Sequence, residues 1–283
     1  MAGQKRKDAR DGGNSKSKKA MYYKTASSTI HPGTSGIFAT CNRHKERQCT
    51  QELIELFNDE AEKQYNTTEG EASDDDADED NDDIEASLAK ELDSFKAKKA
   101  DKVKLFTPLD LGCECVIFFR TKKPVDPVSF VHKICSEALT SGTKSTRYTL
   151  RLSPVSLTAS ANEDELKKLA LKVLEPHFHA KDQKPLKFAI RPTSRNHTTL
   201  DRDQIIKIVA SAVGNQHKVD LTNYDKLILV EAFKNIIGIS VVDGDFEKLK
   251  RYNLQQIFES KSLESENSKD EPTEKENDDT TTT

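Results

Sequence analysis

The run EGEASDDDADEDNDDIE, residues 69–85, holds eleven acidic residues and no basic one. Like charges at this density repel one another and leave little apolar surface to bury, so the run cannot pack into a core. We therefore predict a disordered insertion that interrupts the first folded region. Ser73 stands directly before a series of acids, as acid-directed kinases require, and we predict that it is phosphorylated.

The formal net charge of -4 conceals a partition of charge along the chain. Residues 1–24 carry +6, the acidic run -11 and residues 259–283 -6, which leaves +7 on the remainder. We predict disordered tails at 1–26 and 259–283 and a basic folded part that suits an anionic partner. The clusters KRKDAR and KSKK are typical of nuclear import, and five irregularly spaced cysteines indicate a soluble intracellular protein.

The first folded region has the pattern strand, helix, strand, helix, strand. The predicted elements are a strand at 36–41, a helix at 46–65, a strand at 113–119, a helix opened by Asp126 and Pro127, and a strand at 147–152. Two helices on one face of a small antiparallel sheet make a ferredoxin-like layer, giving the chain an α+β fold. We assign this domain to residues 27–142. An apolar stripe from Ile84 to Phe95 has no assigned role.

A second domain is predicted at residues 143–250. Its elements are a helix capped by Asn162 and ended by Pro176, the strand that Pro192 stops, and a helix capped by Asp201. A central strand at 227–233 is joined by Lys234 and Asn235 to a strand at 236–242, as a hairpin. We predict disorder after Tyr252.

The sequence offers few residues with catalytic spacing. No phosphate-binding glycine motif is present, so we predict no nucleotide cofactor. Cys113 and Cys115 are expected on one strand face without a metal, and His177 at a helix end in a packing role. Asp243 and Asp245 fit a strand-ending turn, although they also leave open an enzyme site with His177.

The basic residues are more informative. Residues 181–202 hold six Lys or Arg against two Asp. Outward-facing arginines beside a small polar side chain favour contacts with phosphate and ribose, whereas a solvated sheet edge accounts for scattered lysines only. The pattern predicts RNA contacts at Arg147, Arg151, Lys187, Arg191, Arg195 and Asn196.

Five segments carry a resemblance to a known family. They are PGTSGIFATC with RHKERQCTQEL, TRYTLRLSPV, PHFH, KFAIRPTSRN and VDLTNYDKLILVEAFKNIIGISVVDGDF, in order from about Pro32 to Tyr252. Together they resemble the eukaryotic THUMP-domain adaptor of tRNA cytidine acetylation. The resemblance implies a ferredoxin-like domain followed by a THUMP domain that binds tRNA, and it adds Lys234 and Asn235 to the RNA-facing set.

The resemblance also implies a division of labour. The family member is non-catalytic and presents serine and leucine tRNAs to a separate RNA cytidine acetyltransferase, which uses acetyl-CoA and ATP to form N4-acetylcytidine in the D arm. A nuclear, and in particular nucleolar, location with some cytoplasmic protein is expected. Two alternatives stay open: a general RNA-binding or ribosome-assembly factor, and an enzyme with an unrecognised site.

Overall fold

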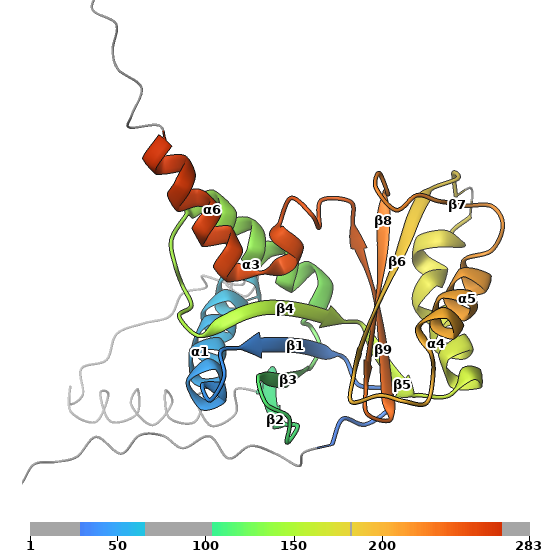
Figure 1. Ribbon diagram of the computed structural model, residues 1–283, viewed down its shortest axis with the longest axis horizontal. Helices are drawn as coiled ribbons and strands as arrows, with labels where there is room; N and C mark the ends of the chain where they lie inside the picture. The colour runs from blue at the N-terminus through green and yellow to red at the C-terminus, as the bar shows by residue number, and fades with distance from the viewer. Residues whose placement is uncertain (1–28, 66–103, 182, 268–283) are drawn as a thin grey trace, which may run out of the picture.

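A computed structural model describes residues 29–65, 104–181 and 183–267. Three predictions lie outside these residues: the basic tail, the acidic run with Ser73, and the stripe from Ile84 to Phe95. Within them the chain forms two sheets, each with its own pair of helices (Figure 1).

The first sheet is antiparallel, and α1 and α3 pack on one of its faces. Its strands lie in the order β2-β3-β1-β4, and its elements follow the split βαβ order of strand, helix, strand, strand, helix, strand. The elements are β1 (Gly36–Cys41), α1 (Glu46–Tyr65), β2 (Phe106–Asp110), β3 (Val116–Thr121), α3 (Pro127–Ser141) and β4 (Thr149–Val155).

Two details of this sheet differ from the prediction. Strand β2, which has five residues, was not predicted because it contains Pro108, and a proline argues against a strand. The proline is tolerated because β2 lies at the edge of the sheet, where its missing N–H can face away from the neighbouring strand. The third strand begins at Val116, so Cys113 and Cys115 lie in the turn before it rather than on a strand face. Cys115 has a φ of 62°, which belongs to a turn.

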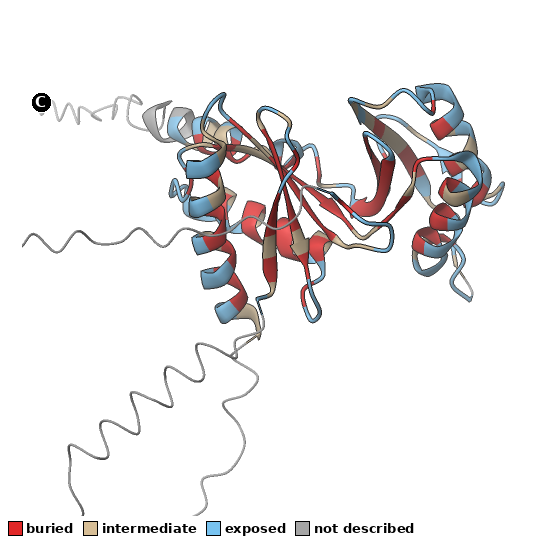
Figure 2. Ribbon diagram, turned by 90° about the horizontal axis from the view of Figure 1, so that it is seen from below, coloured by how far each residue is buried: buried red, intermediate tan, exposed pale blue. Residues whose placement is uncertain are grey.

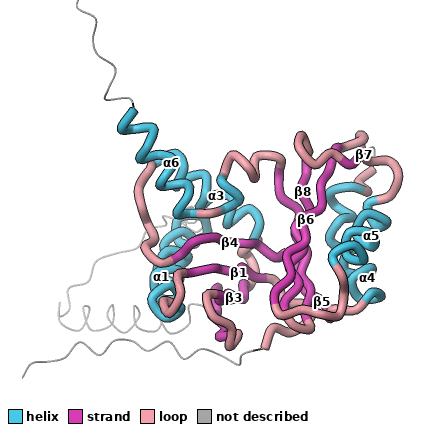
Figure 3. Tube along the Cα trace, viewed as in Figure 1, coloured by secondary structure: helices cyan, strands magenta, loops and turns pink. Residues whose placement is uncertain are grey.

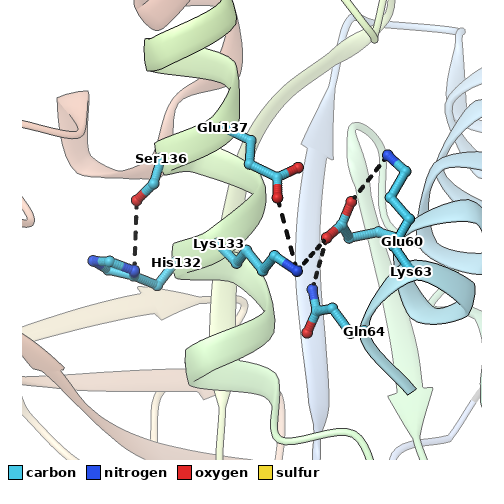
Figure 4. Close-up of polar contacts among 7 residues, drawn as sticks. All are labelled: Glu60, Lys63, Gln64, His132, Lys133, Ser136 and Glu137. Carbon is cyan, nitrogen blue, oxygen red and sulfur yellow. Dashed lines mark hydrogen bonds and ion pairs between the residues drawn. The ribbon is translucent and has the colours of Figure 1, made fainter. Parts of the chain in front are cut away.

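The two helices of the first sheet form as predicted. Asp126 caps α3 by accepting a hydrogen bond from the backbone of Ser129 (2.9 Å). Glu60 of α1, only 2% exposed, joins the helices through an ion pair with Lys133 of α3 (3.2 Å) (Figure 4). Gln64 donates a further hydrogen bond to the same carboxylate (2.9 Å). A buried acid is thus neutralised at the α1–α3 contact.

The second sheet is mixed, with the strand order β5-β9-β8-β6-β7. Strand β6 runs parallel to both of its neighbours, and a parallel pair needs a crossover such as the helix between β6 and β8. Asn162 and Asp201 cap the helices as predicted. The elements are β5 (Leu157–Ser160), α4 (Glu163–Phe178), β6 (Lys187–Arg195), α5 (Arg202–Val213), β7 (Lys218–Val219), β8 (Lys226–Phe233) and β9 (Ile236–Asp243).

Two prolines do not end their elements. Helix α4 continues through Pro176 to Phe178, because the loss of one hydrogen bond in its last turn is outweighed by the complete burial of the Phe178 ring. Strand β6 continues through Pro192 to Arg195. Strand β7 pairs with only the first two residues of β6, so Pro192 lies on an edge.

The first sheet extends beyond residue 143, where the second domain was assigned to begin. Strand β4 pairs with β1 from Cys41↔Thr149 to Gly36↔Val155, so it completes the first sheet. The chain passes into the second sheet between β4 and β5. The hairpin of β8 and β9 around Lys234 and Asn235 is confirmed.

The chain then returns to the first sheet. A short helix η1 (Lys250–Tyr252) leads to α6 (Leu254–Asn267), which packs on α3 and β4. The prediction of disorder after Tyr252 is therefore wrong up to Asn267. The side chains of Leu254, Ile257 and Phe258 are buried, and their i, i+3, i+4 spacing anchors the helix despite its acidic surroundings.

The second sheet is buried on both faces. Helices α4 and α5 cover one face, while the first sheet with α3 and α6 lies against the other (Figure 3). Leu227 and Leu229 of β8 share a core with Phe130 of α3 and Ile257 of α6. Buried residues therefore continue from one sheet into the other (Figure 2).

Candidate functional site

An arginine cluster lies where the two sheets and η1 meet. Its members are Arg151 of β4, Arg191 and Arg195 of β6, and Arg251 of η1, and each of the other three affects the ionisation of Arg151. Odd-numbered β6 residues face the first sheet, as shown by the place of Ala189 in the shared core, whereas Phe188 packs under α4 and α5. Because side chains alternate along a strand, Arg191 and Arg195 lie on the same face of β6 as Ala189, toward the first sheet.

Glu247 links two members of the arginine cluster. Its carboxylate accepts from Nη2 of Arg191 (2.6 Å) and from Nε of Arg251 (2.7 Å). Burial opposes its charge, but these hydrogen bonds lower the pKa of Glu247 below its usual value. The Arg191 guanidinium also lies 5.4 Å from the centre of the Phe246 ring, which fixes its orientation.

A second acid, Glu231 of β8, is buried under the same cluster. Burial raises the pKa of Glu231 to about 7, although Arg195, a hydrogen bond from Ser153 and Arg151 all favour its charged form. Near neutral pH this carboxyl is therefore only partly ionised. It does not supply a full negative charge to its arginine neighbours.

Positive charge exceeds negative charge in the arginine cluster. Burial lowers the pKa of Arg151, and repulsion from Arg251 and Arg195 lowers it further. Two buried guanidinium nitrogens, Nε of Arg151 and Nη1 of Arg191, have no hydrogen-bond partner among the described residues. Four arginines with one ionised and one half-ionised acid make a site that attracts an anion.

Two of the predicted residues lie away from the arginine cluster. Lys187 begins β6 and pairs with Asp220 (3.1 Å), about 26 Å along the strand from Arg195. The predicted strand at 147–152 begins two residues later, at Thr149, so Arg147 precedes β4 and does not share a strand face with Arg151. Its guanidinium lies 5.6 Å from the centre of the Tyr148 ring.

Three other predicted residues lie at the end of the second sheet where β6 ends and β8 turns into β9, and two of them contact the first domain. Asn196, with a φ of 49°, donates from its amide to Sγ of Cys113 (3.4 Å). Lys234 donates from Nζ to the carbonyl of Leu111 (2.8 Å). The carbonyl of Asn235 accepts from the backbone just before α4 (2.9 Å). The contacts of Asn196 and Lys234 connect the second sheet to the β2–β3 turn, and that of Asn235 stays within the second sheet's own unit, so we leave the three residues out of the arginine cluster.

Sequence reasoning missed Arg251, Glu231 and Glu247. Arg251 lies in a basic stretch, Lys248 to Arg251, which could have indicated an anion-binding site. It was missed because the stretch follows the last predicted strand and had no predicted element to place it. Glu231 lay inside an apolar strand, where nothing in the sequence shows which arginines face it. These charges come together only where β4, β6, β8 and η1 meet in the fold.

Two of the three residues considered for enzyme chemistry line a separate pocket of about 290 Å³ between α3 and β9. Asp243 and His177 lie in its wall, and His132 of α3 pairs with Asp245 (2.7 Å). Burial, and then Lys226, lowers the pKa of His177. Across residues 29–65, 104–181 and 183–262, no three His, Cys, Asp or Glu residues gather as metal ligands. No helix in the described part is long and apolar enough to cross a membrane.

Comparisons with known proteins agree with this architecture. Residues 160–242 match the THUMP domain. The protein named tRNA acetyltransferase TAN1 from Saccharomyces cerevisiae is 40% identical over 272 residues, covering 89% of this chain and 94% of that protein. THUMP domain-containing protein 1 from Mus musculus is 34% identical over 237 residues, covering 82% of this chain and 66% of that protein.

Among solved structures, PH1313 from Pyrococcus horikoshii Ot3 is 13% identical with a TM-score of 0.41, covering 74% of this chain and 55% of that one. The identity and coverage of the curated relatives are much higher, and they extend over both sheets. The chain therefore belongs to the THUMP-domain family that includes yeast tRNA acetyltransferase TAN1 and mouse THUMP domain-containing protein 1.

Proposed function

We propose that this chain is a non-catalytic tRNA-binding adaptor. In this proposal it presents serine and leucine tRNAs to a separate RNA cytidine acetyltransferase, which forms N4-acetylcytidine in the D arm. The name of the yeast relative connects the family with tRNA acetylation, and the THUMP match supports an RNA ligand. The partner enzyme would supply acetyl-CoA and ATP binding, in the nucleus and in particular the nucleolus.

The observation that carries the RNA-binding part is the excess of positive charge in the arginine cluster. Arg191 is about one-third exposed (34%) and Arg251 about half exposed (55%), so both can reach a ligand in solvent. Arginine forks suit phosphate oxygens because they donate two parallel hydrogen bonds. Since the members of the arginine cluster include no aromatic side chain that could stack on a base, we propose that the cluster binds the RNA backbone.

A double substitution, Arg191→Gln with Arg195→Gln, tests this site. We expect weaker tRNA binding and a salt dependence, as log K against log salt, that is flatter by about two units, because two phosphate contacts are lost. The matched control is Lys172→Gln with Lys207→Gln on α4 and α5, which removes the same charge from the far side of the second sheet. An unchanged salt slope in a folded cluster variant would remove the arginine cluster as the RNA site.

The non-catalytic part requires a different measurement. Purified chain, tRNA and acetyl-CoA with ATP should give no acetylated cytidine, whereas adding the acetyltransferase should give it. The pocket with His177 and Asp243 is the observation that favours an enzyme instead. Product formed by the chain alone, and lost in His177→Ala, would replace the adaptor proposal with that second candidate.

The choice of RNA is tested in cells. Crosslinking and sequencing of the bound RNA should enrich serine and leucine tRNAs over other tRNAs. Enrichment of precursor ribosomal RNA without tRNA would favour a ribosome-assembly factor.

A further inference from the structure

We propose a second RNA-binding surface on the first sheet, which we call the β1–α1 platform. It consists of Arg43, His44, Lys45, Arg47 and Arg147. The inference rests on the proposed RNA-binding function and deepens it. One RNA backbone would contact the platform and the arginine cluster together.

The platform is a tight turn that concentrates basic side chains. The backbone N–H of Lys45 donates to the carbonyl of Asn42 (3.1 Å), and His44 has a φ of 60°. This turn sets four basic residues within five positions of the chain. Arg43 has 70% of its side chain exposed, and Arg47 is also exposed. The charge is therefore displayed to solvent at the end of β1.

Tyr148 brings two of these cations together. Nζ of Lys45 lies 5.8 Å from the centre of its ring, and the guanidinium carbon of Arg147 lies 5.6 Å from it. Neither cation makes an ion pair with a described acid. Attraction to the ring holds both positive charges beside Tyr148, where the backbone of an RNA can contact them.

Two neighbouring acids accept hydrogen bonds from backbone N–H groups rather than from the platform's side chains. Glu52 accepts from the backbone of Arg147 (3.0 Å), Tyr148 (3.0 Å) and Thr149 (2.8 Å). Glu46 accepts from the backbone of Cys115 (2.9 Å), and this bond lowers the pKa of Glu46.

Among the described residues, one acid forms an ion pair with a platform side chain: Glu114 pairs with Nε of Arg43 (3.2 Å). Both partners are well exposed, so the pair is weak and an anion can compete for Arg43. The acids at the base of the platform thus hold its backbone in place, while most of its cations remain available.

Strand β4 connects the platform to the arginine cluster. Arg147 precedes β4 and Arg151 lies within it, four residues or about 13 Å further on. In Figure 1 β4 runs from the side of α1 to the second sheet. A single phosphate cannot bridge this separation, but a polynucleotide carries phosphates along its whole length. Because the platform continues the arginine cluster, for which an RNA backbone is the proposed ligand, we assign the same RNA backbone to both.

The test replaces the two cations on Tyr148, using Lys45→Gln with Arg147→Gln in the full chain. We expect tRNA affinity at about 0.1 M salt to fall roughly tenfold and the salt slope to flatten by about one to two units. Binding is measured by fluorescence anisotropy over a range of salt concentrations. The control is again Lys172→Gln with Lys207→Gln, and Lys45→Arg with Arg147→Lys should retain the slope.

The outcomes separate this inference from the proposed function. If Arg191→Gln with Arg195→Gln weakens binding but the platform variant does not, the platform is not an RNA site and the arginine cluster stands. If neither variant changes the slope, the RNA-binding proposal itself fails. If the platform and the arginine cluster bind the same RNA, a variant that combines both double substitutions should flatten the salt slope by about the sum of the two separate effects.

Discussion

Glu231 shows how a single residue sets the charge of the arginine cluster. It lies within reach of Arg195 and Arg151, yet burial raises its pKa to about 7. Its carboxyl is neutral in mildly acidic solution and becomes charged as the pH rises through 7. A negative charge formed there competes with any phosphate for the same guanidinium groups. The net attraction of the site for an anion therefore depends on this one proton.

We predict that tRNA affinity falls several-fold between pH 6 and pH 8, because Glu231 ionises over this range. Glu231→Gln keeps the shape of the side chain and removes its titration, so affinity in this variant should vary much less with pH. Anisotropy titrations at constant ionic strength measure the difference. Equal pH dependence in both proteins would contradict the assignment.

The same shift has a consequence for folding. The pKa of Glu231 is higher in the folded chain than the ordinary 4.5, so its contribution to stability is complete below pH 4.5 and is lost as the pH rises through 7. We predict that Glu231→Gln gains stability relative to the parent protein on going from pH 5 to pH 8, by up to about 3 kcal/mol. Urea unfolding at the two pH values tests this.

At the scale of elements, helices with strong end signals were predictable. Helix α1 has the predicted bounds, Glu46 to Tyr65, and α3 begins where Asp126 and Pro127 indicated. The missed elements, β2, β5, β7, η1 and α6, are short or are stabilised by neighbours distant in sequence. The arginine cluster was partly predictable because Arg151, Arg191 and Arg195 were identified from the sequence. Their acids were missed because β4, β8 and η1 meet only in the fold.

The α1–α3 contact carries a prediction of its own. Burial opposes the charge of Glu60, but hydrogen bonds from Gln64 and Lys133 lower its pKa overall. The stabilisation is therefore present above the ordinary pKa and is lost as the pH falls below it. We predict that Glu60→Gln lowers the free energy of unfolding by about 1–2 kcal/mol at pH 7, with a smaller difference near pH 3.

Glu137 supplies the matched control for Glu60. It approaches Lys133 at 3.8 Å from a position that is 49% exposed. Glu137→Gln should change the free energy of unfolding by less than about 0.5 kcal/mol, because exposed ion pairs contribute little. Similar effects for the two substitutions would show that burial does not distinguish them.

At the scale of the whole molecule, the two sheets share one core. Residues of β8, α3 and α6 lie in the same apolar cluster, so neither sheet can unfold without exposing residues of the other. We predict a single unfolding transition, and a loss of about 2–5 kcal/mol when buried Leu254 is changed to Ala. Circular dichroism and tyrosine fluorescence should report the same midpoint. Gln256→Ala, at an exposed position of α6, is the control.

The return of α6 to the first sheet also matters during synthesis. The ribosome delivers β1 to β4 early, but Leu254, Ile257 and Phe258 follow only after the whole second sheet. At about 5–20 residues per second, a delay of roughly 5–20 seconds separates β4 from these residues. During this time the α3 and β4 surfaces that α6 covers stay exposed. The nascent chain thus presents an apolar target for chaperones that the finished protein no longer has.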